Sequence, residues 1–114
     1  MKLELRGSEG GIVRAACSGS MTLLPTGGPG DALKQVLGGE CYRSRLLFDL
    51  GGVDYIDSSG VSWLLLLHSH CTDAGGKLVL HSLQARVRGT FDLLQLGSVL
   101  HLASDETAAR HLCG

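Results

Sequence analysis

Five pairs of adjacent glycines divide this chain of 114 residues into short segments. Glycine is common in tight turns and breaks regular structure, so each pair predicts a loop. None of the pairs belongs to a G-x-G-x-x-G or G-x-x-x-x-G-K-[S/T] motif, so no nucleotide-binding loop is predicted. Short segments separated in this way are typical of alternating strands and helices. The pairs are Gly10-Gly11, Gly27-Gly28, Gly38-Gly39, Gly51-Gly52 and Gly75-Gly76.

The apolar runs between the glycine pairs predict a mixed β-sheet of four to five strands. Leu3–Arg6 alternates in polarity and Ile12–Cys17 is rich in small and β-branched residues, so these segments predict an N-terminal hairpin. Arg45–Leu50 is nearly continuous in apolar character, which is typical of a strand buried on both faces. Further strands are expected at Lys77–Leu80 and Val99–Leu102.

About four helices are expected around this sheet. The segment Ser18–Gly30 contains many helix breakers and predicts a long loop. Ser104 is followed three residues later by Thr107, a partial capping box that predicts the start of a C-terminal helix. This order of elements predicts one α/β domain over residues 1–114. The other helices are expected at Asp31–Leu37, from Asp57 or Ser58 to Asp73, and from Val87 to Leu96.

The charge balance and hydropathy exclude several classes of function. Ten lysines and arginines against eleven aspartates and glutamates give a formal net charge of -1, without the basic excess that nucleic acid binding requires. The longest apolar run, Trp63–Leu67, is far shorter than the roughly 20 residues of a membrane span. The charged N-terminus, Met1–Arg6, differs from a secretory signal. We therefore expect a cytoplasmic protein that neither binds nucleic acid nor inserts into a membrane.

Cysteine and histidine do not predict a metal site. The four cysteines are far apart and form no C-x-x-C pair, so reduced thiols are expected. His68, His70 and Cys71 are close in sequence, but a helix would place only His68 and Cys71 on one face. Two ligands are too few for a structural zinc site. No metal and no cofactor are expected.

Reactive polar groups concentrate in the turn Asp57-Ser58-Ser59-Gly60, at the start of a predicted helix. A helix N-terminus has free backbone N–H groups and the positive end of the helix dipole, so it favours a phosphate on a serine there. Asp and Ser are also ordinary N-cap residues, so a capping turn without a further function is the alternative. No base and no G-x-S-x-G elbow accompany these serines, so we do not expect an enzyme.

The same turn lies in a stretch that is similar to a known family. Leu46–Val61, Ala74–Leu80 and Phe91–Gly97 resemble the STAS domain family of bacterial anti-sigma factor antagonists. In that family the first serine of the equivalent turn is phosphorylated by an anti-sigma factor serine kinase. The resemblance implies that Ser58 is the acceptor here, with Ser59 as the alternative.

The resemblance also implies a mechanism of partner switching. The unphosphorylated protein would bind the kinase, displace a sigma factor and be released once phosphorylated. Family members usually have an aspartate soon after the glycine that follows the second strand, whereas Gly19 is followed here by Ser20. This departure motivates an alternative, a constitutive accessory or scaffold subunit of a transporter or signalling complex that is not phosphorylated. The residues expected to bind a partner are Asp57, Ser58, Ser59, Gly60, Val61, Ser20, Met21 and Thr22.

Overall fold

The structure, a computed structural model, describes residues 2–24, 33, 35–36, 38 and 41–113. Within this part of the chain, five strands form one mixed sheet in the order β1-β2-β3-β4-β5. β1 and β2 pair antiparallel, and every other neighbouring pair is parallel. The predicted hairpin and the central position of β3 are therefore confirmed. The strands are β1 (Lys2–Glu9), β2 (Ile12–Ser18), β3 (Arg45–Gly52), β4 (Lys77–His81) and β5 (His101–Ala103).

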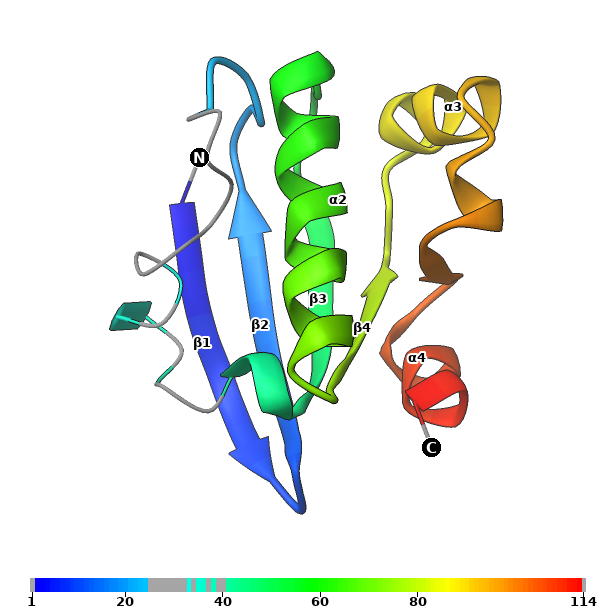
Figure 1. Ribbon diagram of the computed structural model, residues 1–114. Helices are drawn as coiled ribbons and strands as arrows, with labels where there is room; N and C mark the ends of the chain where they lie inside the picture. The colour runs from blue at the N-terminus through cyan, green and yellow to red at the C-terminus, as the bar shows by residue number, and fades with distance from the viewer. Residues whose placement is uncertain (1, 25–32, 34, 37, 39–40, 114) are drawn as a thin grey trace.

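Helices pack on both faces of this sheet. α2 and α3 cover one face, and α4 covers the other. Figure 1 shows α2 running along β3, with α3 and α4 further along the sheet, past β4. The predicted helix at Asp31–Leu37 falls mainly on residues outside the described ones, although Leu33 is described and is fully buried. No helix in the described part of the chain is long and apolar enough to cross a lipid bilayer. The helices that lie wholly within the described residues are α2 (Ser58–Asp73), α3 (Ala85–Leu93) and α4 (Glu106–Cys113), with the short 3-10 helices η1 (Cys41–Arg43) and η2 (Leu96–Ser98).

Strand β3 is buried on both faces, as its continuous apolar run predicts. Phe48 and Leu50 point into the larger core, which α2 and α3 cover. Trp63 of α2 meets Phe48 edge-on, with ring centroids 6.1 Å apart. Leu47 points to the opposite face, because side chains alternate along a strand. There it packs beneath α4 with Val79, Ala103 and Ala109.

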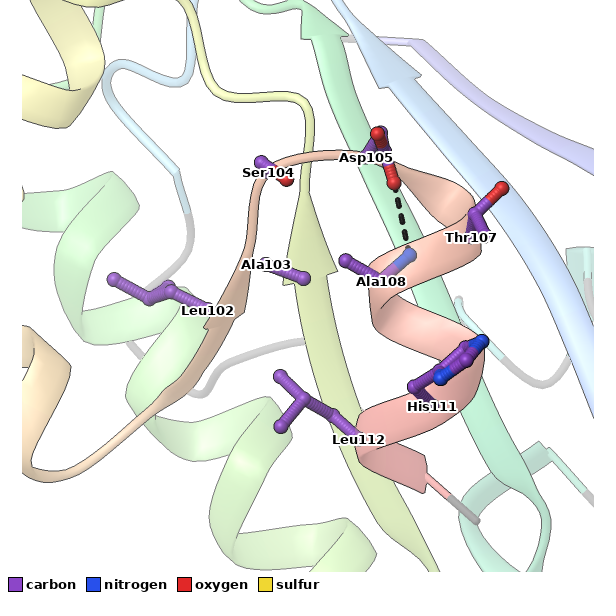
Figure 2. A pocket seen from close by; sticks show the side chains of 8 residues that line it. All are labelled: Leu102, Ala103, Ser104, Asp105, Thr107, Ala108, His111 and Leu112. Atoms are coloured by element: carbon purple, nitrogen blue, oxygen red, sulfur yellow. Dashed lines mark hydrogen bonds between the residues drawn. The ribbon is translucent and has the colours of Figure 1, made fainter.

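Two predictions for the C-terminal part are wrong in detail. The third predicted helix ends before Leu96, because Gln95 adopts a left-handed backbone conformation (φ 55°) and separates α3 from η2. The last helix is capped by Asp105 and not by Ser104. Asp105 Oδ1 accepts a 2.8 Å hydrogen bond from the N–H of Ala108 (Figure 2). An acidic cap at this place also suits the helix dipole.

Candidate functional site

Helix α2 begins at Ser58 because Asp57 caps it. The Oδ1 atom of Asp57 accepts a 3.1 Å hydrogen bond from the N–H of Gly60 and a 2.6 Å hydrogen bond from the hydroxyl of Ser59. Its Oδ2 atom accepts a third hydrogen bond, 3.2 Å long, from the N–H of Leu23. These bonds, the one from Ser59 first, hold the pKa of Asp57 below its ordinary value of 3.8. Asp57 is therefore a fixed, ionised carboxylate at neutral pH.

The two serines of the turn differ in how their hydroxyls are used. Ser59 is half-buried, donates to Asp57, and accepts a 2.9 Å hydrogen bond from the N–H of Leu24. Ser58 is exposed at the first position of α2, and its hydroxyl has no hydrogen-bond partner among the residues that the structure describes. The Ser58 hydroxyl is thus accessible, whereas the Ser59 hydroxyl is part of the structure of the turn.

The segment that follows β2 lies directly against this turn. The N–H of Met21 donates a 2.9 Å hydrogen bond to the carbonyl of Tyr55, and the carbonyl of Met21 accepts one of 3.2 Å from the N–H of Asp57. A Cβ atom on Gly60 would collide with the carbonyl oxygen of Met21 and lie 2.6 Å from Cγ1 of Ile56. Only glycine therefore allows the helix to begin so close to this segment.

The residues expected to bind a partner divide into an accessible and a buried set. Ser20 and Ser58 are exposed, whereas Thr22, Asp57 and Ser59 are half-buried. The remaining three are buried. Met21 is 0% exposed and Val61 is 9% exposed, both as part of the core, and Gly60 is buried against Met21. They support the turn from within, and their part in binding a partner stays a prediction.

Asp54 is a further residue of this site, and no sequence motif predicts its role. The hydroxyl of Ser20 donates a 3.1 Å hydrogen bond to Asp54 Oδ1. A carboxylate therefore lies beside Ser20, where the family resemblance leads us to expect an aspartate. Ser20 and Asp54 are 34 residues apart in the chain, and no local sequence pattern connects them.

A pocket of about 680 Å³ lies elsewhere, between β5 and α4 (Figure 2). Most of its lining is apolar, and its one carboxylate, that of Asp105, is already engaged as the cap of α4. It shares no residue with the turn at the start of α2, so it does not extend the candidate site. The lining residues are Leu102, Ala103, Ser104, Asp105, Thr107, Ala108, His111 and Leu112.

The histidines of α2 contact other rings. The ring centroids of His68 and His101 are 5.9 Å apart, and those of His70 and Tyr42 are 5.3 Å apart. Across the described ranges, no three His, Cys, Asp or Glu side chains gather as a ligand set for a metal ion.

Burial raises the pKa of the Cys17 thiol to about 11, so this thiol is protonated at neutral pH.

This chain is similar to anti-sigma factor antagonists in sequence and in structure. BtrV of Bordetella bronchiseptica, which bears the name anti-sigma factor antagonist, is 35% identical over 65 residues. That match spans 57% of this chain and 56% of BtrV. The crystal structure of an anti-sigma factor antagonist from Mycobacterium paratuberculosis superposes with a TM-score of 0.70 at 18% identity, over 98% of this chain and 94% of the other. SpoIIAA in its unphosphorylated form gives a TM-score of 0.68 at 17% identity, over 97% and 96%.

The two structural similarities concern the fold, because their sequence identities are low. Each superposition extends over nearly the whole of both chains, so the similarity concerns the fold as a whole and not one part of it. A sequence model of the STAS domain matches residues 13–109, which run from the second residue of β2 to the middle of α4. On this match, the chain belongs to the STAS domain family.

Proposed function

We propose that this chain is an anti-sigma factor antagonist that exchanges partners under the control of phosphorylation. The unmodified protein binds an anti-sigma factor serine kinase, displaces a sigma factor, and is released when Ser58 is phosphorylated. The chain acts by binding and not by catalysis, and the exchange takes place in the cytoplasm. Its membership of the STAS domain family and the names of BtrV and of the two structural neighbours favour this role.

The observation that carries the proposal is the difference between Ser58 and Ser59. A kinase has to bring the attacking hydroxyl in line with the phosphate that is transferred. The exposed hydroxyl of Ser58 can enter a kinase active site without breaking a hydrogen bond to any described residue. The hydroxyl of Ser59 would first lose its bonds to Asp57 and Leu24. The geometry therefore favours Ser58 as the acceptor.

A phosphate on Ser58 would change the electrostatics of the turn. It adds about two negative charges at the N-terminus of α2, where the helix dipole stabilises an anion in water. In a complex, the same dianion would lose its hydration shell next to the ionised carboxylate of Asp57. Desolvation and like-charge repulsion together remove about 2–5 kcal/mol from a protein interface. One modification is therefore sufficient to release the partner.

Asp54 bears on the choice between a regulated and a constitutive protein. Ser20 replaces the aspartate that the family pattern has, and this replacement favours the second candidate, an accessory or scaffold subunit that is not phosphorylated. However, Ser20 donates a hydrogen bond to Asp54, and both residues are exposed. A carboxylate is therefore present beside Ser20 although residue 20 itself is not an aspartate. We therefore place the regulated protein first.

A phosphorylation assay with matched serine variants tests the acceptor. Wild type, Ser58→Ala and Ser59→Ala are incubated with ATP and the cognate serine kinase, and the phosphates on each intact chain are counted by mass spectrometry. We expect one phosphate on wild type and on Ser59→Ala, and none on Ser58→Ala. Phosphate on Ser58→Ala but not on Ser59→Ala would move the acceptor to Ser59.

Affinity purification separates the regulated from the constitutive function. Wild type and Ser58→Asp serve as baits in cell extract, and the proteins that they hold are identified by mass spectrometry. A serine kinase held by wild type and lost from Ser58→Asp is the result expected of a switch. If both baits hold the same transporter ATPase and carry no phosphate, the constitutive subunit replaces our proposal.

A further inference from the structure

His68, in the third turn of α2, has a buried ring nitrogen without a partner. The Nδ1 atom of His68 is buried and forms no hydrogen bond with any residue that the structure describes. Almost every buried polar atom of a folded protein has a partner, in the protein itself or in a bound water or ion. Arg14 Nε is the other such atom in the described part of the chain, but the guanidinium of Arg14 also lies 3.8 Å from the carboxylate of Glu106. The imidazole of His68 has no such second contact, so its nitrogen calls for a partner from outside the chain.

His101 of β5 presents a second imidazole to His68. The two ring centroids are 5.9 Å apart, and the ring planes are inclined by 63°. Zinc binds an imidazole nitrogen at about 2.0–2.1 Å, which places the centroids of two imidazoles on one ion about 5–6 Å apart. The observed separation lies within this range. His68 is half-buried and His101 is exposed, so an ion can reach the pair from solvent and keep water at its open positions.

The charged groups around His101 indicate the class of ion. Burial first, and then Lys77 and His68, lower the pKa of His101 from 6.5, so its imidazole is neutral at neutral pH and can bind a metal. No carboxylate is among the groups that act on this pKa. Magnesium and calcium require oxygen ligands, whereas zinc, copper and nickel bind imidazole. The ammonium of Lys77 is not a ligand, because it has no lone pair, and it donates a 2.7 Å hydrogen bond to the carbonyl of Leu112.

We propose that His68 and His101 form a two-histidine site for a divalent transition metal ion such as zinc, which joins α2 to β5. Among the described residues no third His, Cys, Asp or Glu completes the set. Water or a side chain of a bound protein therefore fills the other positions, and the ion exchanges more readily than one in a four-ligand structural site. The ion stabilises the folded state, because the unfolded chain does not hold the two rings together. This site goes beyond the proposed function and does not depend on it.

A zinc titration of the metal-free protein tests this site by calorimetry. Wild type is compared with His68→Gln, His101→Gln and His111→Gln after a chelator has removed bound metal. We expect His68→Gln and His101→Gln each to weaken zinc binding at least about tenfold, because each removes one of the two ligands. His111→Gln is the matched control, since His111 is exposed on α4, and it should bind zinc within about twofold of wild type.

Urea denaturation adds a second measurement on the same four proteins. Zinc should raise the urea midpoint of wild type and of His111→Gln, and should leave the midpoints of the other two variants unchanged. His101→Gln replaces an exposed side chain, so this variant is expected to fold even if His68→Gln does not.

Three outcomes would overturn the inference. Equal zinc affinity in all four proteins would mean an adventitious ion only. Wild type that binds no zinc would leave the two histidines as a ring contact. A sulfur-to-metal charge-transfer band when cobalt replaces zinc would assign the ion to a cysteine instead. The titration contains no kinase, so none of these outcomes affects the proposed function.

Discussion

The α-carbon of Gly60 lies so close to the carbonyl oxygen of Met21 that no side chain fits between them. This contact lets α2 begin against the segment after β2. We therefore predict that Gly60→Ala lowers the free energy of unfolding by about 1–3 kcal/mol, because the added methyl group meets backbone that cannot move aside without breaking the bonds of Met21. Urea denaturation followed by circular dichroism measures the change.

Gly89→Ala is the matched control for this substitution. Gly89 lies inside α3, and a Cβ atom there would meet nothing within 4 Å. Alanine has the higher helix propensity, so this variant should gain about 0.5–1 kcal/mol. Equal effects at the two positions would show that the close approach of Gly60 to Met21 does not matter for stability.

Ser58 and Ser59 should also differ in what they contribute to stability. Ser59→Ala removes the acceptor for the N–H of Leu24 and a donor to Asp57, and should cost about 1 kcal/mol. Ser58→Ala removes an exposed hydroxyl and should stay within about 0.5 kcal/mol of wild type. Thermal or urea unfolding of both variants checks the difference. A larger loss for Ser58→Ala would mean that its hydroxyl stabilises the turn.

Local sequence signals were sufficient for most of the fold. The run Arg45–Leu50 predicts the central strand because a strand buried on both faces needs apolar residues at successive positions. The sequence offered Asp57 or Ser58 as the start of α2, and Asp57 is the cap, since capping depends only on residues within one turn. At the start of α4, Ser104 and Asp105 are adjacent residues that can each cap a helix, and the sequence does not distinguish them. Asp105 is the cap and not Ser104.

The arrangement around the candidate site could be predicted only in part. The turn itself is local, but the hydrogen bonds from Ser20 to Asp54 and from Leu23 to Asp57 join residues 34 positions apart, and sequence spacing carries no information about such pairs. The burial of Met21 has the same origin. It follows from a parallel bridge to Ile56, which forms only when the segment after β2 extends alongside the one after β3.

The stability of the protein should fall in acid partly through Asp57. Its pKa in the folded state lies below the ordinary value of 3.8, because the hydroxyl of Ser59 and the N–H of Gly60 and Leu23 bond to the charged form. The folded state thus binds fewer protons than the unfolded state in this range. The contribution of Asp57 is present above pH 3.8 and is lost as the pH falls through the lower folded pKa.

Asp57→Asn tests this contribution. The amide cannot ionise, so the difference in free energy of unfolding between wild type and variant should be largest near neutral pH and should shrink below pH 3.8. Urea denaturation across this range measures the difference. A gap that stays constant with pH would show that the hydrogen bonds of Asp57 do not depend on its charge.

His81 should give a second decline in stability at a higher pH. Its side chain is 3% exposed at the end of β4, and burial is the main cause that lowers its pKa from 6.5; nearby carboxylates, with Asp49 first, oppose this shift. Below pH 6.5 the unfolded state therefore takes up a proton more readily than the folded state, so the free energy of unfolding decreases until the pH passes the folded pKa. His81→Gln should reduce this decline and leave the part that comes from His101, whose pKa burial also lowers, whereas His111→Gln, at an exposed position of α4, should retain the whole of it. Urea titrations of the three proteins between about pH 7.5 and 5 measure how the free energy of unfolding changes with pH. If it changes as steeply in His81→Gln as in wild type, another group causes the decline.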